Sequence, residues 1–172
     1  LIILSYSPDV QFGSNNVLAI LLDMNYLFEE YVYRILKHEE DKFTHLNLKI
    51  KAQQNKSFWS SRKIRPDIIM QYEEEKEKKI IIDTKWKILT DYDPSDDDLR
   101  QMYAYNLHFN ANKSVLLYPK LNLSNQEPVN FKPSESVTKE HACQIAFADL
   151  FNDEGNPIKG VGNKILTYIL ES

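Results

Sequence analysis

The sequence predicts a mixed α/β layer fold in a single domain. Its 172 residues suit one domain, and its 42% hydrophobic and 27% charged residues are ordinary for a soluble globular protein. Along the chain, patterns typical of a helix, a strand, a hairpin, a second helix and a further strand follow one another. That order favours a mixed central sheet flanked by helices.

Three segments carry helical patterns. Residues 24–38 place apolar side chains on one helix face, with Asp23 or Asn25 as the N-cap. A second helix is expected from Ser95 or Asp96 to about residue 109, and a short one over 164–171.

Alternating or continuous apolar runs predict the strands, which cover residues 46–51, 67–72, 79–89, 113–118 and 141–150. Residues 52–63 are polar, and we expect a loop there. Two aromatic residues lie in this loop, Phe58 and Trp59, and local packing is favoured over stacking on a base. The acidic run 91–98 is interpreted as a solvated turn and helix cap.

We expect the chain to have three parts. Residues 1–22 are expected to be a lead-in segment from an upstream region, 23–120 the core, and 121–172 a C-terminal extension packed on it. The apolar runs are far too short to cross a membrane. A lone cysteine, Cys143, excludes a disulfide scaffold and fits a cytoplasmic location.

The most informative residues are Asp67, Asp83 and Lys85. If strands 67–72 and 79–85 form a hairpin whose turn is centred near Glu75, antiparallel pairing places residue 67 opposite residue 83. Directly opposed residues project to one face, with Cβ atoms about 4.5–5.5 Å apart. Lys85 lies two positions from Asp83 and shares that face.

This arrangement points to metal-dependent phosphate chemistry. Two adjacent carboxylates are unfavourable without a cation, and Mg²⁺ prefers oxygen ligands of this kind, with Mn²⁺ as a substitute. Such an ion can activate water and stabilise charge on a phosphate. Lys85 would orient the water or offset charge in the transition state.

A basic stretch precedes Asp67. Residues 42–65 hold seven Lys or Arg and no acidic residue, although the whole chain has a net charge of −4. Because of their proximity to Asp67, we expect Arg62, Lys63 and Arg65 to contact DNA phosphates.

Together, several motifs resemble the nuclease domain of the McrC family, which has a PD-(D/E)xK restriction-endonuclease-like core. In chain order they are residues 22–30, Arg-Pro-Asp-Ile at 65–68, Asp-Thr-Lys-Trp-Lys at 83–87, Gln-Met-Tyr-Ala-Tyr at 101–105 and Leu-Leu-Tyr-Pro at 116–119. The resemblance covers about residues 22–120. It implies metal-dependent cleavage of double-stranded, modified DNA in a McrBC-type restriction system, together with a McrB-like AAA+ GTPase partner.

The resemblance also extends the site. In the PD-(D/E)xK superfamily an acidic residue of the first helix often joins the metal site, and Glu29 is the preferred candidate. The backbone carbonyl of Thr84 is a further candidate ligand. Gln101 and Tyr105 resemble the Q-x-x-x-Y element of some branches and are assigned to DNA binding, with helix packing as the alternative.

Two other functions remain open at this stage. One is a RecB-like repair nuclease, and the other is a non-catalytic subunit that activates a partner NTPase. The sequence contains no G-x-x-x-x-G-K-[ST] motif, so this chain is not expected to be the nucleotide hydrolase itself.

Overall fold

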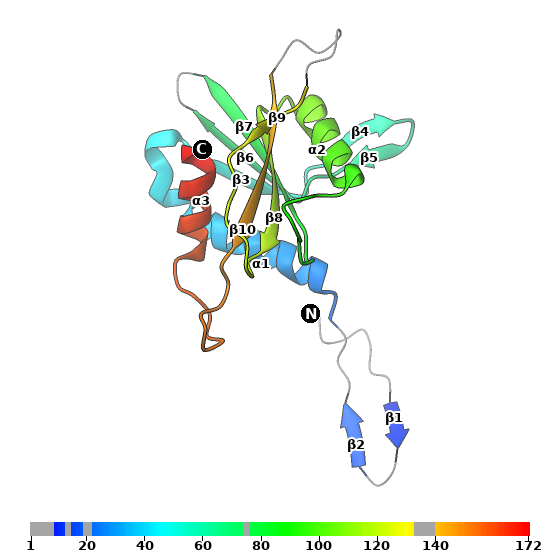
Figure 1. The fold of residues 1–172 in the computed structure, drawn as a ribbon. Coiled ribbons are helices and arrows are strands. Elements are labelled where there is room, and N and C mark those ends of the chain that lie inside the picture. The colour runs from blue at the N-terminus through cyan, green and yellow to red at the C-terminus, as the bar shows by residue number, and fades with distance from the viewer. Residues whose placement is uncertain (1–8, 13–14, 19–21, 74–75, 133–139) are drawn as a thin grey trace.

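A six-stranded mixed sheet forms the centre of the protein in the computed structural model, which describes residues 9–12, 15–18, 22–73, 76–132 and 140–172. The strand order is β3-β6-β7-β8-β10-β9 (Figure 1). The outer pairs β3–β6, β6–β7 and β10–β9 are antiparallel, whereas β7, β8 and β10 run parallel. The strands cover Lys49–Ala52 (β3), Ile68–Glu73 (β6), Glu77–Thr84 (β7), Lys113–Pro119 (β8), Val129–Asn130 (β9) and Ala142–Ala148 (β10).

Helices cover both faces of this sheet, as the sequence predicts. One core cluster joins α1 (Met24–Glu39) and α3 (Val161–Glu171) to the strand residues Ile80 and Ile82. The other joins α2 (Asp96–Phe109) to Ile81. Neighbouring residues of β7 therefore point to opposite layers, and the odd-numbered ones face α2.

The helix ends follow local sequence signals. The Asp23 carboxylate accepts hydrogen bonds from the backbone N–H groups of Asn25 and Tyr26, which confirms Asp23 as the cap of α1. Ser95 caps α2 through the N–H of Asp98. The third helix begins at Val161, three residues before the predicted start.

Three predicted boundaries are wrong. A 3-10 segment, η2 (Glu40–Leu46), and a left-handed residue, Asn47, delay the start of β3 to Lys49. Strand β7 ends at Thr84 rather than near residue 89, because the N–H of Lys87 turns back to the carbonyl of Lys85. The predicted loop at 52–63 contains a hairpin of β4 (Lys56–Trp59) and β5 (Arg62–Ile64).

The predicted flanking parts also contain regular structure. Two short strands in the lead-in segment, β1 (Asp9–Phe12) and β2 (Asn15–Leu18), form an antiparallel pair of their own. In the C-terminal extension, β10 joins the central sheet beside β8, and α3 packs against α1. None of the helices in the described residues has the length and apolar character that a membrane crossing requires.

Candidate active site

The β6–β7 hairpin has the register that the sequence predicts. Ile68 pairs with Ile82, and Ile69 with Ile81, so residues 67 and 83 lie at the same end of the hairpin. The side chain of Asp67 is fixed there: its Oδ2 accepts hydrogen bonds from the N–H of Thr84 at 2.7 Å and from the Thr84 hydroxyl at 2.8 Å. The two predicted carboxylates therefore share one end of the hairpin, close enough for the charge of Asp67 to act on Asp83.

Asp83 is a buried acid in an unfavourable setting. Its side chain is 4% exposed, and its Oδ2 lies 2.6 Å from the Nζ of Lys85. Burial and the neighbouring Asp67 raise the pKa of Asp83 to about 6, even though Lys85 opposes the shift. The local charge balance therefore favours the arrival of another cation.

Lys85 is held by three oxygen-bearing side chains. Besides Asp83, Nζ lies 3.1 Å from Oδ1 of Asp98 and donates to Oε1 of Gln101 at 2.9 Å. Burial alone would lower the pKa of Lys85, but its contacts with Asp83 and Asp98 outweigh burial and raise it. Lys85 is consequently a fixed cation next to the carboxylate pair.

Asp98 belongs to this site, although we expected the acidic run 91–98 to be solvated. It is 8% exposed, and its Oδ2 accepts from Lys87 at 2.6 Å and from the Ser95 hydroxyl at 2.8 Å. Burial opposes ionisation, but the hydrogen bonds from Lys87, Ser95 and Lys85 prevail and lower the pKa of Asp98 to about 2. The signal in the sequence is the spacing of Asp98, Gln101 and Tyr105, which share one face of a helix.

Gln101 and Tyr105 connect α2 to the segment that leads into Asp67. The Gln101 amide donates to the Tyr105 hydroxyl at 2.9 Å, which in turn donates to the carbonyl of Arg65 at 3.0 Å. Tyr105 is 5% exposed, and burial raises its pKa to about 12. DNA binding by this pair stays a prediction, since the contacts in the structure are to other residues of the site.

Glu29 lies at the margin of the carboxylate pair. Its Oε1 accepts from the Gln53 amide at 2.6 Å, and Gln53 also accepts from Arg65 at 3.4 Å. Burial and the charge of Asp67 raise the pKa of Glu29, while the Gln53 hydrogen bond opposes the shift. Glu29 is close enough to Asp67 to interact electrostatically, and Gln53 is a connecting residue that the sequence did not indicate.

The side chains present suit a hard divalent cation, although they are not assembled as a complete ligand set. Within the described residues, no cluster of three His, Cys, Asp or Glu side chains is placed to hold a metal ion. The two carboxylates nevertheless provide oxygen donors, and burial together with the charge of Asp67 raises the pKa of Asp83. The Thr84 carbonyl and Glu29 remain predicted additional ligands.

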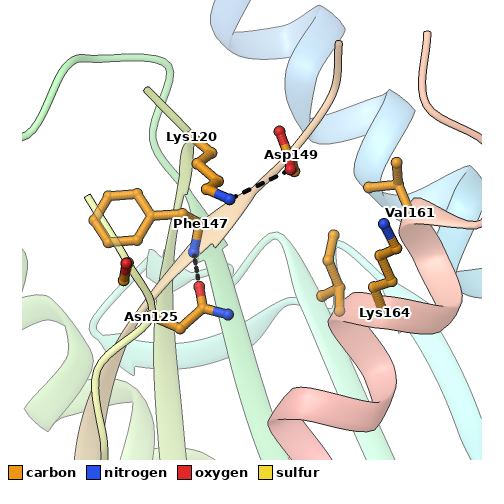
Figure 2. A pocket seen from close by; sticks show the side chains of 8 residues that line it. Lys120, Asn125, Phe147, Asp149, Val161 and Lys164 are labelled. Atoms are coloured by element: carbon orange, nitrogen blue, oxygen red, sulfur yellow. Dashed lines mark hydrogen bonds and ion pairs between the residues drawn. The ribbon is translucent and has the colours of Figure 1, made fainter. Parts of the chain in front are cut away.

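The predicted phosphate contacts lie on β5 and on the segment that leads from it to Asp67. Arg62 and Lys63 are exposed on β5, and the exposed Arg65 precedes Pro66 and Asp67. A separate hollow of about 460 Å³ lies near the ends of β8 and β10, where Lys120 is paired with Asp149 (Figure 2). None of the predicted site residues lines that hollow.

A family model described as McrBC 5-methylcytosine restriction system component matches residues 1–119, more than half of the chain. This chain belongs to that McrBC family. The match confirms the resemblance to McrC that the motif order indicates. Among curated proteins, no sequence matches this one.

A solved structure shares the fold of this McrBC-family chain. It is described as a refined half-complex from a tetradecameric assembly of Thermococcus gammatolerans McrB AAA+ hexamers with bound McrC. The similarity covers 90% of this chain with a TM-score of 0.66 at 18% sequence identity, which shows a common fold. This chain spans 34% of the length of that chain.

Proposed function

We propose that this chain is the metal-dependent DNA endonuclease domain of a McrBC-type, modification-dependent restriction system. The observation that carries the proposal is the pair of Asp67 and Asp83 at one end of a hairpin, with Lys85 fixed against it, in a chain of the McrBC family. Phosphodiester hydrolysis needs compensation of negative charge and an oriented water, and these three side chains are suited to both.

Asp67 and Asp83 would hold Mg²⁺, with Mn²⁺ as a substitute and with Glu29 and the Thr84 carbonyl as supporting ligands. A divalent ion bound there would act as a Lewis acid toward the phosphate and the attacking water. Thr84 keeps the Asp67 carboxylate in a fixed orientation through two hydrogen bonds. Fixed ligands of this kind reduce the reorganisation that binding would otherwise require.

Lys85 would place its ammonium near the attacked phosphate. In the structure it contacts Asp83, Asp98 and Gln101. A cation that binds to Asp83 would compete with Lys85 for that carboxylate, while Asp98 and Gln101 retain the ammonium in the site. Lys85 would then be available to orient water or to offset charge as the phosphate is attacked.

Arg62, Lys63 and Arg65 would bind backbone phosphates of double-stranded DNA beside this centre. We further propose a McrB-like AAA+ GTPase as partner, since the similar Thermococcus gammatolerans structure contains McrC bound to McrB hexamers. The absence of a phosphate-binding G-x-x-x-x-G-K-[ST] motif from this sequence agrees with a separate nucleotide hydrolase.

The test compares wild-type protein with Asp67→Ala and Asp83→Ala. We expect calorimetry to detect Mg²⁺ or Mn²⁺ binding in the wild type, either directly or with an uncleavable DNA duplex present, and to detect none in either variant. Cleavage of modified DNA is measured in the complex with the AAA+ partner. Asp97→Ala, an exposed acid outside the site, is the matched control and should retain activity. Unchanged cleavage by Asp83→Ala would contradict the proposed function.

A further inference from the structure

The segments just before and just after the β4–β5 hairpin both contact residues of the candidate site. Before the hairpin, the N–H of Gln53 donates to the carbonyl of Asp67 at 2.8 Å, and its side chain binds Glu29. After the hairpin, the carbonyl of Arg65 accepts from Tyr105, two residues before Asp67. Both ends of this hairpin are therefore fixed to residues that surround the carboxylate pair.

The body of the hairpin is held against the last turn of α2. Lys56 donates through its Nζ to the carbonyl of His108 and lies 5.6 Å from the centre of the Phe109 ring. The Phe58 ring meets the His108 ring edge-on at 5.2 Å. Figure 1 shows β4 and β5 projecting beyond α2 as an arm. An arm anchored in this way presents its outer side chains in a defined position.

Trp59 is the most exposed aromatic side chain of this arm. We expected it to pack locally, but it is 71% exposed. Within the described residues, its ring makes no aromatic contact and its indole N–H no hydrogen bond. Trp59 pairs across the hairpin with Arg62, at a position where the register shifts. A single exposed apolar residue is ordinary, but a large one on an anchored basic arm beside a candidate active site is a typical contact residue.

The charge of the arm selects the chemistry of its partner. Lys56, Arg62 and Lys63 lie on the two strands, and residues 42–65 contain no acid, in a chain whose net charge is −4. Within the described part of the chain, neither Arg62 nor Lys63 forms an ion pair. Cations that flank an exposed indole match a nucleic acid strand, which offers phosphates and stackable bases together.

We propose that the β4–β5 hairpin is a DNA-binding arm in which Trp59 stacks on a base that is unpaired or opened beside the cleavage site. This inference rests on the proposed nuclease function, and it adds a contact to a base rather than to a phosphate. Arg62 and Lys63 bind phosphates of the same strand. Stacking needs an accessible base face, so the arm favours DNA that contains an unpaired segment over fully paired DNA.

The test measures DNA affinity of the full-length protein in the absence of divalent metal, so that no cleavage occurs. Two labelled probes are used: a fully paired duplex and the same duplex with a short single-stranded gap. Because a base stacked on an aromatic side chain contributes substantially to affinity, Trp59→Ala should weaken binding to the gapped probe by about ten-fold. The same substitution should change binding to the paired duplex less than about two-fold, and Trp59→Phe should retain most of the affinity.

Controls separate this contact from general effects. Phe151→Ala removes another exposed aromatic side chain, 55% exposed, and should leave both affinities unchanged. Lys63→Ala should weaken binding to both probes and reduce the salt dependence, as loss of a phosphate contact does. The gapped probe should also quench tryptophan fluorescence in the wild type but much less in Trp59→Phe.

The outcomes distinguish this inference from the proposed function. If Trp59→Ala binds the gapped probe with wild-type affinity, or if the probe leaves tryptophan fluorescence unchanged, the proposed stacking role of Trp59 is wrong. The cleavage assay of Asp83→Ala tests the proposed nuclease function independently. If Trp59→Ala binds DNA normally but no longer binds the AAA+ partner, the DNA-binding role is also wrong, because the hairpin would then be a protein contact. If Asp83→Ala cleaves normally but Trp59 affects DNA binding, the arm is supported and the catalytic assignment fails.

Discussion

Asp83 is the residue whose environment is least favourable and most informative. A buried carboxylate next to a second carboxylate reduces the stability of the folded protein unless a cation compensates it. Lys85 compensates only in part, since the pKa of Asp83 remains raised to about 6. Buried ionisable groups with strongly shifted pKa values concentrate at functional sites, where the residue is required for binding or catalysis rather than for stability.

We therefore expect Asp83→Asn to abolish cleavage and to stabilise the metal-free protein above pH 6. Between pH 3.8, the ordinary value, and about 6, the folded chain keeps a proton on Asp83 that the unfolded chain has released. The free energy of unfolding consequently falls as the pH rises through this window, and the loss persists above it. Removal of the charge should recover on the order of 1 kcal/mol at pH 8, or about 2–4 °C in Tm.

Thermal unfolding in EDTA at pH 5 and pH 8 measures this effect. The gain in Tm should be larger at pH 8 than at pH 5. An equal gain at both pH values, or a loss at pH 8, would show that Lys85 compensates Asp83 fully.

Asp98 is expected to act as a positioning residue for Lys85. Asp98→Asn should lower the cleavage rate of the complex by about ten- to a hundred-fold, because small displacements of a catalytic group carry penalties of that size. Metal affinity should be retained, since Asp67 and Asp83 are unchanged. Asp97→Asn is the matched control, since the Asp97 side chain is 92% exposed and pairs with Arg100. Equal activities of the two variants would exclude the positioning role.

A site residue could be predicted from the sequence when its contacts lie within one hairpin, and could not be when they depend on packing between distant segments. Asp67, Asp83 and Lys85 were predictable because strand pairing has a period of two and one hairpin sets their register. Asp98 and Gln53 were not, since their roles depend on the packing of α2 and of the segment before β4 on that hairpin. Acid-rich turns and polar loops are usually solvated, so composition alone pointed away from both.

At the scale of elements, α2 and the sheet together form the candidate site. Three residues on one face of α2 make these contacts: Asp98 and Gln101 bind Lys85, and Tyr105 donates a hydrogen bond to the carbonyl of Arg65. Periodicity predicted this helix and the strands in the correct order. It did not predict the end of β7, where the N–H of Lys87 donates to the carbonyl of Lys85. It also did not predict the β4–β5 hairpin, because that hairpin depends on a contact outside its own segment: Lys56 binds the end of α2.

The contact between α1 and α3 provides a test of packing in the C-terminal part. Gly162 lies where an added Cβ would meet the backbone carbonyl of Ile35, with the carbonyl carbon at 2.8 Å. In an unobstructed helix Gly→Ala would stabilise by up to about 1 kcal/mol. Here we expect Gly162→Ala to destabilise by about 1–3 kcal/mol, since the neighbour is backbone and the helices must separate.

Chemical denaturation measures that difference, with Asn163→Ala as the control in the same helix turn. The control should be neutral or slightly stabilising because alanine favours helix more than asparagine does. If Gly162→Ala is also stabilising, α3 is not packed against α1 as described.

At the scale of the whole molecule, the fold brings Glu29 and Asp98 close to the carboxylate pair and leaves other acids, such as Asp96 and Asp97, exposed outside the site. The chain carries 25 acidic residues and a net charge of −4, so acidic groups outside the site could also attract a cation. The run at 91–97 is the main competitor, but Asp96 and Asp97 are exposed and pair with Arg100. Ion pairs at such exposed positions are weak, and no ligand geometry is imposed there.

Stability measurements on the intact protein can distinguish a cation bound at Asp67 and Asp83 from one bound at the acidic run 91–97. A ligand present at a hundred times its Kd raises the free energy of unfolding by about 2.7 kcal/mol. We therefore expect saturating Mg²⁺ to raise the Tm at pH 8 by about 5–10 °C. At pH 5 the increase should be smaller, because Asp83, with its pKa raised to about 6, holds a proton that must leave before the cation binds. Asp67→Ala should remove the increase at both pH values, and Asp97→Ala should leave it intact. A Tm increase that is independent of pH and survives Asp67→Ala would place the cation outside the β6–β7 hairpin.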